Sequence, residues 1–280
     1  MSRNNTCLLQ AFSRDSNVVR DDPDLQLPAG LSGHTRLLQI EDRKFIIRSP
    51  LSATPMPGID RRREFRLLRH LHNSACAPAA YLYQQGALLL EWLPGSVLSD
   101  KQFNAQMPVL SDALASLHRY PLSGYNLSLT ALLEQYWLLS APSRRHFRWF
   151  HAWRRCLRHG EPHPLRVGLL HMDIQPGNIV MAHGMMRFID WEYAGNGDIA
   201  LELAAVIEAN NISCEARHQL VSCYAAAQNL LVSRLQQQIE RWIPWVKLLS
   251  ACWYELRWQQ GGDVSMRTLA DKAWERLITV

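Results

Sequence analysis

His171-Met172-Asp173-Ile174-Gln175-Pro176-Gly177-Asn178 is the stretch that decides the fold of this chain, together with Asp190, which follows it by twelve residues. Pro176-Gly177 favours a sharp turn. The apolar residues at 179–181 and 186–189 predict two short strands, which are separated by a turn at 183–184. A hairpin of this kind brings Asn178 and Asp190 to the same end. The stretch therefore predicts a site where two carboxylates and one carboxamide meet.

These three residue types match the needs of phosphoryl transfer. A catalytic loop of the form H-x-D-x-x-x-x-N supplies an aspartate that orients the acceptor hydroxyl and takes its proton, and an asparagine that holds Mg²⁺; a later aspartate chelates metal on the ATP phosphates. Asp173 fits the catalytic role, and Asn178 and Asp190 fit the metal roles, with Mg²⁺ as cofactor and ATP as co-substrate. Each residue alone could be a turn or capping residue, but the combined pattern favours catalysis.

The composition is that of a folded enzyme of moderate size. The 280 residues, 48% of them hydrophobic, suffice for a large core and suit one bilobal enzyme or two small domains. No stretch of about eighteen apolar residues and no secretory leader is recognisable, so neither membrane spanning nor secretion is indicated. The six scattered cysteines lack metal-binding spacing and are expected to stay reduced. We expect a cytoplasmic protein without a membrane partner.

Arginine supplies most of the positive charge. Only four of the 30 basic residues are lysines, and the net charge is +5. Arginines cluster at residues 61–69 and 144–158, in segments with helical patterns, where a solvated basic face is more common than a polyanion site. We therefore expect no nucleic-acid partner, although a basic face could attract anionic ATP.

The start of the chain offers a turn that could cover phosphates. Gly30, Ser32 and Gly33 lie between two predicted strands, where backbone N–H groups could contact ATP. Two glycines make a weak motif, and an ordinary hairpin turn fits them equally well. This turn is a candidate ATP contact.

The next strand and helix offer a pair of opposite charges. The strand at 44–48 ends with Arg48, the candidate cation for the α- and β-phosphates of ATP. The helix predicted at 59–71 has an apolar stripe and carries Glu64 at the edge of that stripe, where it could pair with Arg48. The alternative is a surface ion pair without a catalytic role.

A second hairpin, over residues 81–83 and 87–92, leads into the expected hinge. Glu91, Trp92 and Leu93 are the candidate ATP contacts there, and apolar residues recur at helical spacing after them. The chain therefore predicts an α+β fold. Residues 1–93 form an N-terminal lobe of strands and one helix, and residues 94–280 form a helical lobe with the catalytic and metal loops, with ATP bound between them.

The chain resembles the aminoglycoside phosphotransferase and choline kinase family, whose motif matches residues 171–178 and Asp190. The resemblance implies a protein-kinase-like bilobal fold with a small antiparallel sheet and a larger, mainly helical lobe. It also implies ATP-dependent transfer to the hydroxyl of a small molecule, which is thiamine in the most similar subgroup. Arg48 replaces the lysine of many members, and Glu202 stands where much of the family has aspartate. The segments that carry the similarity to this subgroup are 45–50, 170–173, 189–195, 197–206 and 241–258.

A cationic, aromatic alcohol such as thiamine needs carboxylates and ring faces. Two segments offer them: one follows Asp190, and the other is a helix predicted beyond a break at Pro244. For the aromatic residues of the second segment, plain core packing is the alternative. Choline or an aminoglycoside would satisfy the same chemistry, and a non-catalytic nucleotide- or polyanion-binding protein is a further alternative. The candidate substrate contacts, besides Asp173, are Trp191, Glu192, Tyr193, Asp198, Glu202, Trp253, Tyr254 and Glu255.

Overall fold

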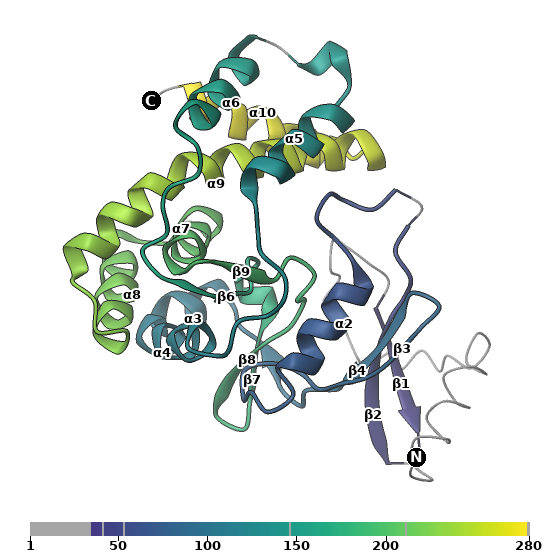
Figure 1. The fold of residues 1–280 in the computed structure, drawn as a ribbon. Coiled ribbons are helices and arrows are strands. Elements are labelled where there is room, and N and C mark those ends of the chain that lie inside the picture. Colours follow the sequence, from purple (N-terminus) through teal and green to yellow (C-terminus); the bar gives the residue numbers. More distant parts are fainter. Residues whose placement is uncertain (1–34, 41, 53, 146, 211, 279–280) are drawn as a thin grey trace. The chain divides into compact units, whose positions relative to one another are not determined.

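The computed structural model describes residues 35–278 except positions 41, 53, 146 and 211 (Figure 1). The glycine turn predicted at Gly30, Ser32 and Gly33 therefore lies outside the described residues. Within the described part of the chain, no helix combines the length and the apolar character needed to cross a bilayer.

Contacts divide the chain into two compact units. Unit 1 comprises the chain up to Pro55, Asp60–Leu98 and Gly177–Glu192, and unit 2 comprises Met56–Ile59, Ser99–Pro176 and Tyr193–Val280. The sheet-rich and helix-rich parts confirm the predicted α+β class. The segment that carries Asn178 and Asp190 groups with the sheet of unit 1, and a domain boundary after residue 93 stays a prediction.

The sheet of unit 1 is built from strands that contain short apolar runs. Leu38, Phe45 and Leu89 pack together as a small core, with Ile47 among the partly buried residues around them. Arg48 ends its strand opposite Leu88, and its side chain is buried. The strands are antiparallel and lie in the order β1 (Thr35–Ile40), β2 (Arg43–Arg48), β4 (Ala87–Glu91) and β3 (Ala80–Gln84).

One helix, α2 (Arg61–His70), accompanies this sheet and confirms the helix predicted for the segment. It begins at Asp60, whose carboxylate accepts hydrogen bonds from the backbone N–H groups of Arg62 at 2.7 Å and Arg63 at 3.1 Å. Such a cap stabilises a helix by about 1 kcal/mol, because the first turn leaves these donors unpaired. The buried side of the helix carries Glu64 together with its leucines, so the carboxylate faces inward.

The second sheet of unit 1 contains the predicted hairpin. Its strands lie in the order β5 (Ser96–Val97), β7 (Ile179–Ala182) and β8 (Met185–Phe188). The ladder extends past β7, because Ile189 donates its N–H to the carbonyl of Asn178 at 2.9 Å. Asn178 is therefore cross-strand from the residue that precedes Asp190, and the predicted hairpin is confirmed.

A glycine lets the chain directly before β5 approach this hairpin. A Cβ atom on Gly95 would lie 2.2 Å from the carbonyl oxygen of Met181, which is far inside any allowed contact. Any other residue here would displace β5 from β7.

Unit 2 is mainly helical, as the apolar spacing predicted. Leu110 and Leu114 on the first long helix are fully buried, and this helix packs against the one that carries Tyr224. Two short strands, β6 (Val167–Leu170) and β9 (Gly195–Asp198), pair antiparallel and lead into the catalytic loop. The helices are α3 (Asp100–Ala105), α4 (Met107–His118), α5 (Leu129–Leu139), η1 (Pro142–Arg144), α6 (Phe147–His159), η2 (Pro176–Asn178, at the boundary with unit 1), α7 (Ile199–Ala209), α8 (Cys214–Ala227), α9 (Val232–Gly261) and α10 (Val264–Ile278).

The expected break at Pro244 is wrong, because α9 runs through it without interruption. A proline inside a helix removes one backbone hydrogen bond and costs about 3 kcal/mol. Ile243, Trp245 and Val246 on either side are buried, and α9 packs against both α7 and α10. Burial of the flanking side chains therefore holds the helix together across the proline.

Candidate active site

The hairpin of unit 1 places the two predicted metal ligands at one end. Asn178 precedes β7 and is buried, and Asp190 follows β8 with a backbone φ of +68°. A second positive φ, +67°, occurs at Met172, directly before Asp173. Left-handed backbone is uncommon for residues other than glycine and costs of order 1–3 kcal/mol. Both parts of the predicted active site therefore contain backbone that packing and hydrogen bonds must hold in place.

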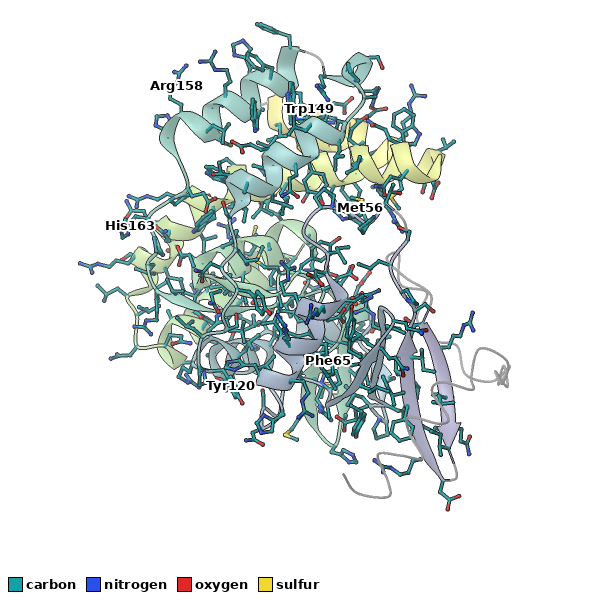
Figure 2. The ribbon with its side chains drawn as sticks, turned by 45° about the vertical axis from the view of Figure 1, so that its right-hand side comes forward. Met56, Phe65, Tyr120, Trp149, Arg158 and His163 are labelled. Carbon is teal, nitrogen blue, oxygen red and sulfur yellow. The ribbon has the colours of Figure 1, made fainter. Side chains whose placement is uncertain are left out.

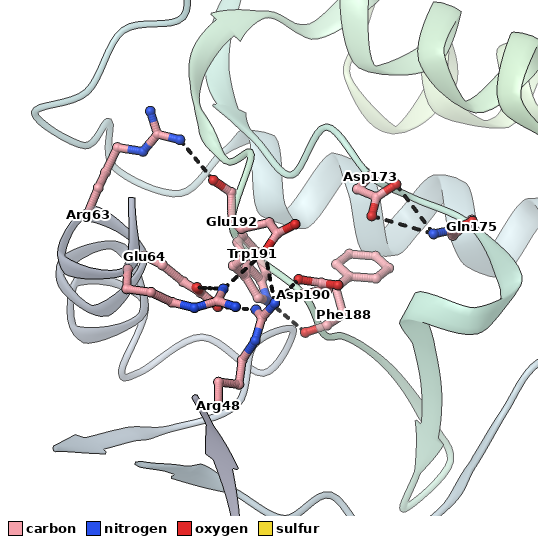
Figure 3. Close-up of polar contacts among 10 residues, drawn as sticks. Arg48, Arg63, Glu64, Asp173, Gln175, Phe188, Asp190, Trp191 and Glu192 are labelled. Atoms are coloured by element: carbon pink, nitrogen blue, oxygen red, sulfur yellow. Dashed lines mark hydrogen bonds and ion pairs between the residues drawn. The ribbon is translucent and has the colours of Figure 1, made fainter. Parts of the chain in front are cut away.

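Arg48 is the centre of a buried ion cluster in unit 1 (Figure 3). Its guanidinium pairs with Glu64, as the sequence predicted, and its Nη2 lies 2.6 Å from Asp190 Oδ1 and 2.9 Å from Glu192 Oε2. Burial acts to lower the pKa of Arg48, but the three carboxylates outweigh it and raise that pKa. Arg48 therefore stays charged and holds strand β2, helix α2 and the end of the hairpin together.

A second arginine completes this cluster. Arg61 Nη1 lies 2.8 Å from Glu64 Oε2 and 3.0 Å from Glu192 Oε2, and Arg63 donates to the backbone carbonyl of Glu192 at 2.8 Å. The solvated basic face expected for the first arginine cluster is wrong for Arg61, which is only 3% exposed. Its position one helical turn from Glu64, at i and i+3, was the signal in the sequence that could have revealed this role.

The cluster contains more acid than base. Glu64, Asp190 and Glu192 face two arginines, Arg48 and Arg61, so one negative charge is left over when all five are ionised. Burial, followed by the charge of Asp190, raises the pKa of Glu192 to about 7. An additional cation at this end of the hairpin would relieve the excess charge.

The donor set at this end of the hairpin suits Mg²⁺. A carboxylate and a carboxamide are the hard oxygen ligands that Mg²⁺ prefers, and it usually completes its shell with water and substrate phosphates. Among the described residues, no group of three His, Cys, Asp or Glu side chains forms a closed metal site. Asn178 and Asp190 fit an ion that depends on a phosphate ligand.

The predicted catalytic loop of unit 2 follows β6, and Glu202 accepts hydrogen bonds from its backbone. The two carboxylate oxygens of Glu202 accept the backbone N–H groups of His171 at 3.0 Å and Met172 at 2.6 Å. His118 Nε2 lies 2.9 Å from the same carboxylate, and its Nδ1 contacts the hydroxyl of Tyr224. Burial opposes the charge on Glu202, but the bond from His118 and the nearby histidines lower its pKa overall.

Glu202 was predicted as a substrate contact, and the structure gives it a different position. Its side chain is fully buried under the loop, so it acts on the residue before Asp173 and not on a ligand. Asp173 itself is half-buried, with the Gln175 amide 3.5 Å from its carboxylate (Figure 3). The helix that carries Glu202 thus holds the backbone directly before Asp173.

Three predicted substrate residues gather in unit 2. Tyr193, Trp253 and Tyr254 are all half-buried. Trp253 donates its indole N–H to the hydroxyl of Tyr193 at 2.9 Å, and its ring meets Tyr254 edge-on with centroids 5.4 Å apart. Burial raises the pKa of Tyr254, and the charge of Asp173 contributes to the same shift. Tyr254 of this aromatic group therefore lies within electrostatic range of the Asp173 carboxylate.

Three other predicted substrate residues are buried and held by protein partners. Trp191 has no exposed surface and donates its N–H to Phe188 at 2.7 Å. Asp198 caps α7 and accepts from Gln238 and Trp242, while Glu255 binds Arg144 through both of its oxygens. Because these side chains are 0–3% exposed, they cannot touch a ligand in this conformation.

The expected hinge residues are ordered by an ion pair. Arg187 of β8 contacts both carboxylate oxygens of Glu91, at 3.1 and 2.9 Å. Burial opposes the charge on Glu91, but the bonds from Arg187 and from Ala79 N–H outweigh it and lower its pKa. Trp92 is half-buried and Leu93 is buried against Val180. Their contact with ATP stays a prediction.

Comparison with known proteins gives a consistent result. The model of the phosphotransferase enzyme family, APH, matches residues 25–253. Thiamine kinase from Escherichia coli O139:H28 is 39% identical over 277 residues, covering 95% of this chain and 98% of the relative, and thiamine kinase from Shigella sonnei gives the same values.

Solved structures show the same fold. Choline kinase LicA from Streptococcus pneumoniae has a TM-score of 0.73 at 16% identity, covering 88% of this chain and 90% of that one, and it has also been solved with AMP. Ethanolamine kinase from Plasmodium vivax has a TM-score of 0.75 at 17% identity, covering 97% of this chain and 86% of that one. The kinase-like fold predicted from the sequence is confirmed.

Proposed function

Because the chain belongs to the phosphotransferase enzyme family, we propose that it transfers the γ-phosphate of ATP to the hydroxyl of thiamine, giving thiamine monophosphate and ADP. The supporting observation from the geometry is the aromatic group of Tyr193, Trp253 and Tyr254 within range of Asp173. Near full-length similarity to proteins named thiamine kinase selects thiamine among the cationic alcohols.

Asp173 acts on the acceptor. Its carboxylate orients the hydroxyl of the hydroxyethyl arm and takes its proton as the oxygen attacks the γ-phosphorus. A new O–P bond forms, the bond between the γ-phosphorus and the bridging oxygen breaks, and ADP leaves with the electron pair. The bonds from Glu202 to the preceding backbone keep this carboxylate in position for the transfer.

The ion cluster binds the phosphates of ATP. Asn178 and Asp190 would hold Mg²⁺, which supplies positive charge to the phosphate oxygens when it is bound. Arg48, kept in place by Glu64, contributes a second positive charge for the α- and β-phosphates. Arg61 also pairs with Glu64 and Glu192, so that Arg48 is not the only positive partner of these two acids.

The aromatic group recognises the other end of the acceptor. The thiazolium ring of thiamine is a cation, and ring faces attract cations by about 0.5–2 kcal/mol each. Trp253 and Tyr254 meet edge-to-face, an arrangement that presents one ring face beside the edge of the other. A flat, charged heterocycle can pack against this ring face beside the edge of the other ring. We place the reaction in the cytoplasm, without a nucleic-acid partner.

The test of the catalytic assignment is Asp173→Ala, assayed for thiamine-dependent ATP consumption. Loss of a general base costs roughly 10²–10⁴-fold in rate, and the variant should unfold at the wild-type temperature. Asp112→Ala, which removes an exposed acid of α4 in the same unit, is the matched control and should retain full activity. Full turnover by Asp173→Ala would overturn the mechanism.

A further inference from the structure

A second basic segment of the chain has no part in the chemistry above. From Gln135 to Gly160 the sequence contains six arginines and three histidines and not one aspartate or glutamate. This stretch covers the end of α5, the turn η1 and all of α6. A run of 26 residues with this imbalance is unusual for a chain whose net charge is only +5.

The arginines at the start of the segment are already used by the fold. Arg144 binds Glu255 and Asp271, and Arg145 donates to the carbonyls of Leu138 and Ser140. These contacts anchor the turn between α5 and α6. The other arginines of the segment lie on α6.

The arginines at the end of α6 point to solvent. Arg154 and Arg158 are exposed one helical turn apart, and no ion pair among the described residues involves either of them. Figure 2 shows Arg158 projecting outward from the end of the helix. Arg154 lies 5.6 Å from the centre of the Phe150 ring. Positive charge and an exposed aromatic ring are therefore adjacent.

Exposed apolar side chains occur in the same segment as this charge. Phe147 is 74% exposed, Leu138 72% and Leu139 59%, which places all three among the most exposed large apolar side chains of the described chain. Phe150, at 37%, continues the stripe toward Arg154. Apolar groups gain about 1.5–3 kcal/mol each when a partner removes them from water.

The two helices that carry these side chains are packed together through aromatic rings. Trp137 of α5 stacks on Trp153 of α6 at 5.2 Å with an angle of 4° between the rings. Trp149, on the inner side of α6, is fully buried and packs against Trp274 of α10. The two helices therefore present their outer side chains as one surface. We define this basic-aromatic surface by Leu138, Leu139, Phe147, Phe150, Arg154 and Arg158.

We propose that the basic-aromatic surface docks the protein on an anionic lipid bilayer. A partner must be negative for the arginines and apolar for Phe147 and the two leucines, and an acidic bilayer is both. A second copy of this surface would place arginine against arginine. A nucleic acid would pair with the arginines and stack on rings, but it would leave the aliphatic leucines in water.

The geometry of α6 is compatible with docking on the bilayer surface and not with crossing the bilayer. α6 has 13 residues and one inward face committed to the core, so only its outer stripe is available to lipid. The lack of a spanning segment, on which the expectation of no membrane partner rests, does not exclude docking through such a surface. This proposal does not depend on the catalytic assignment, because none of its residues belongs to the active site.

The experiment is vesicle co-sedimentation of the full-length protein. Phosphatidylcholine vesicles containing about 30% phosphatidylglycerol are compared with pure phosphatidylcholine vesicles, at low and high salt. We expect binding to the anionic vesicles alone, and we expect salt to weaken it. Each exposed arginine near such a membrane contributes roughly fivefold to affinity, so Arg154→Gln/Arg158→Gln should weaken binding roughly 25-fold.

Matched variants separate charge from apolar insertion. Leu138→Ser/Phe147→Ser should weaken vesicle binding by at least roughly tenfold, because the leucine and the phenylalanine leave water together. Leu231→Ser/Val264→Ser changes two residues of similar exposure elsewhere, and Arg62→Gln/Arg66→Gln removes two exposed arginines of α2. Both controls should bind as the wild type does. Unchanged thermal unfolding and kinase turnover of every variant confirm that it is folded.

Three results would overturn the proposal. One is no binding to anionic vesicles, or equal binding to neutral ones. Another is equal loss of binding in the control variants. A third is that a single-stranded oligonucleotide binds with the same dependence on Arg154 and Arg158 while Leu138→Ser/Phe147→Ser changes nothing, which would identify nucleic acid as the partner.

Discussion

Replacing Glu202 by glutamine should loosen the catalytic loop without touching either substrate. The two oxygens of Glu202 accept hydrogen bonds from three donors: His171 N–H at 3.0 Å, Met172 N–H at 2.6 Å and His118 Nε2 at 2.9 Å. Glutamine has the same shape but only one acceptor oxygen. Its amide nitrogen must therefore face at least one N–H donor.

The size of the effect follows from these contacts. The less costly orientation keeps the oxygen toward His171 and His118 and leaves Met172 N–H without an acceptor. An unsatisfied buried donor costs about 1–3 kcal/mol, and loss of the negative charge weakens the other two hydrogen bonds. The lower cost of burying a neutral side chain offsets part of this loss. We expect the free energy of unfolding to fall by about 2–3 kcal/mol. Displacement of Asp173 should lower kcat by roughly tenfold to a hundredfold.

The assay combines urea unfolding with steady-state kinetics. The KM for ATP should stay at the wild-type value, because Arg48, Asn178 and Asp190 lie in unit 1 and keep their contacts. Glu208→Gln is the control, because Glu208 lies on the same helix and forms a long, weak ion pair of 3.9 Å with Lys247. It should change neither the free energy of unfolding nor kcat by much. An unfolding free energy within about 0.5 kcal/mol of wild type, with unchanged kcat, would refute the assignment of Glu202 as the support of the loop.

The remaining predictions concern the ion cluster and the aromatic group. The folded-state pKa of Glu192, about 7, lies above its ordinary value of 4.5, so the contribution of Glu192 to stability is lost as pH rises from 4.5 to 7. Glu192→Gln should therefore flatten the pH dependence of the free energy of urea unfolding in this range. An unchanged dependence on pH would contradict the raised pKa. Asp190→Asn should collapse the rate and raise the Mg²⁺ concentration that turnover requires, whereas Asp42→Asn, at an exposed position, should do neither. Trp253→Leu should raise the KM for thiamine roughly tenfold with little effect on the KM for ATP. Trp258→Leu removes another half-buried ring of α9, which contacts Arg144 and Arg267, and this comparison should leave both KM values near wild type.

Local patterns predicted much of the fold. The hairpin that joins Asn178 to Asp190 could be predicted because its turn and its strands lie within a dozen residues. Short apolar runs beside turn residues likewise predicted β2 and β4, and helical spacing predicted α4. Each of these elements depends mainly on its own sequence.

Features that depend on distant partners could not be predicted in this way. Arg61 belonged to an arginine-rich run, and its burial depends on Glu192, which is 131 residues away. Glu202 supports the catalytic loop through His118, 84 residues away, and neither segment contains a local signal for the pair. Pro244 ordinarily ends a helix, but the packing of α9 on two other helices overrides that preference. Tertiary contacts decided all three cases.

The proposed substrate and mechanism are tested together by offering the purified protein Mg-ATP with thiamine, choline, kanamycin or homoserine, and by measuring the phosphorylated product. We expect thiamine monophosphate to form and none of the other acceptors to reach a comparable kcat/KM. Phosphorylation of choline without phosphorylation of thiamine would contradict the proposed substrate, and no transfer to any acceptor, with ATP bound, would contradict the catalytic assignment of Asp173, Asn178 and Asp190.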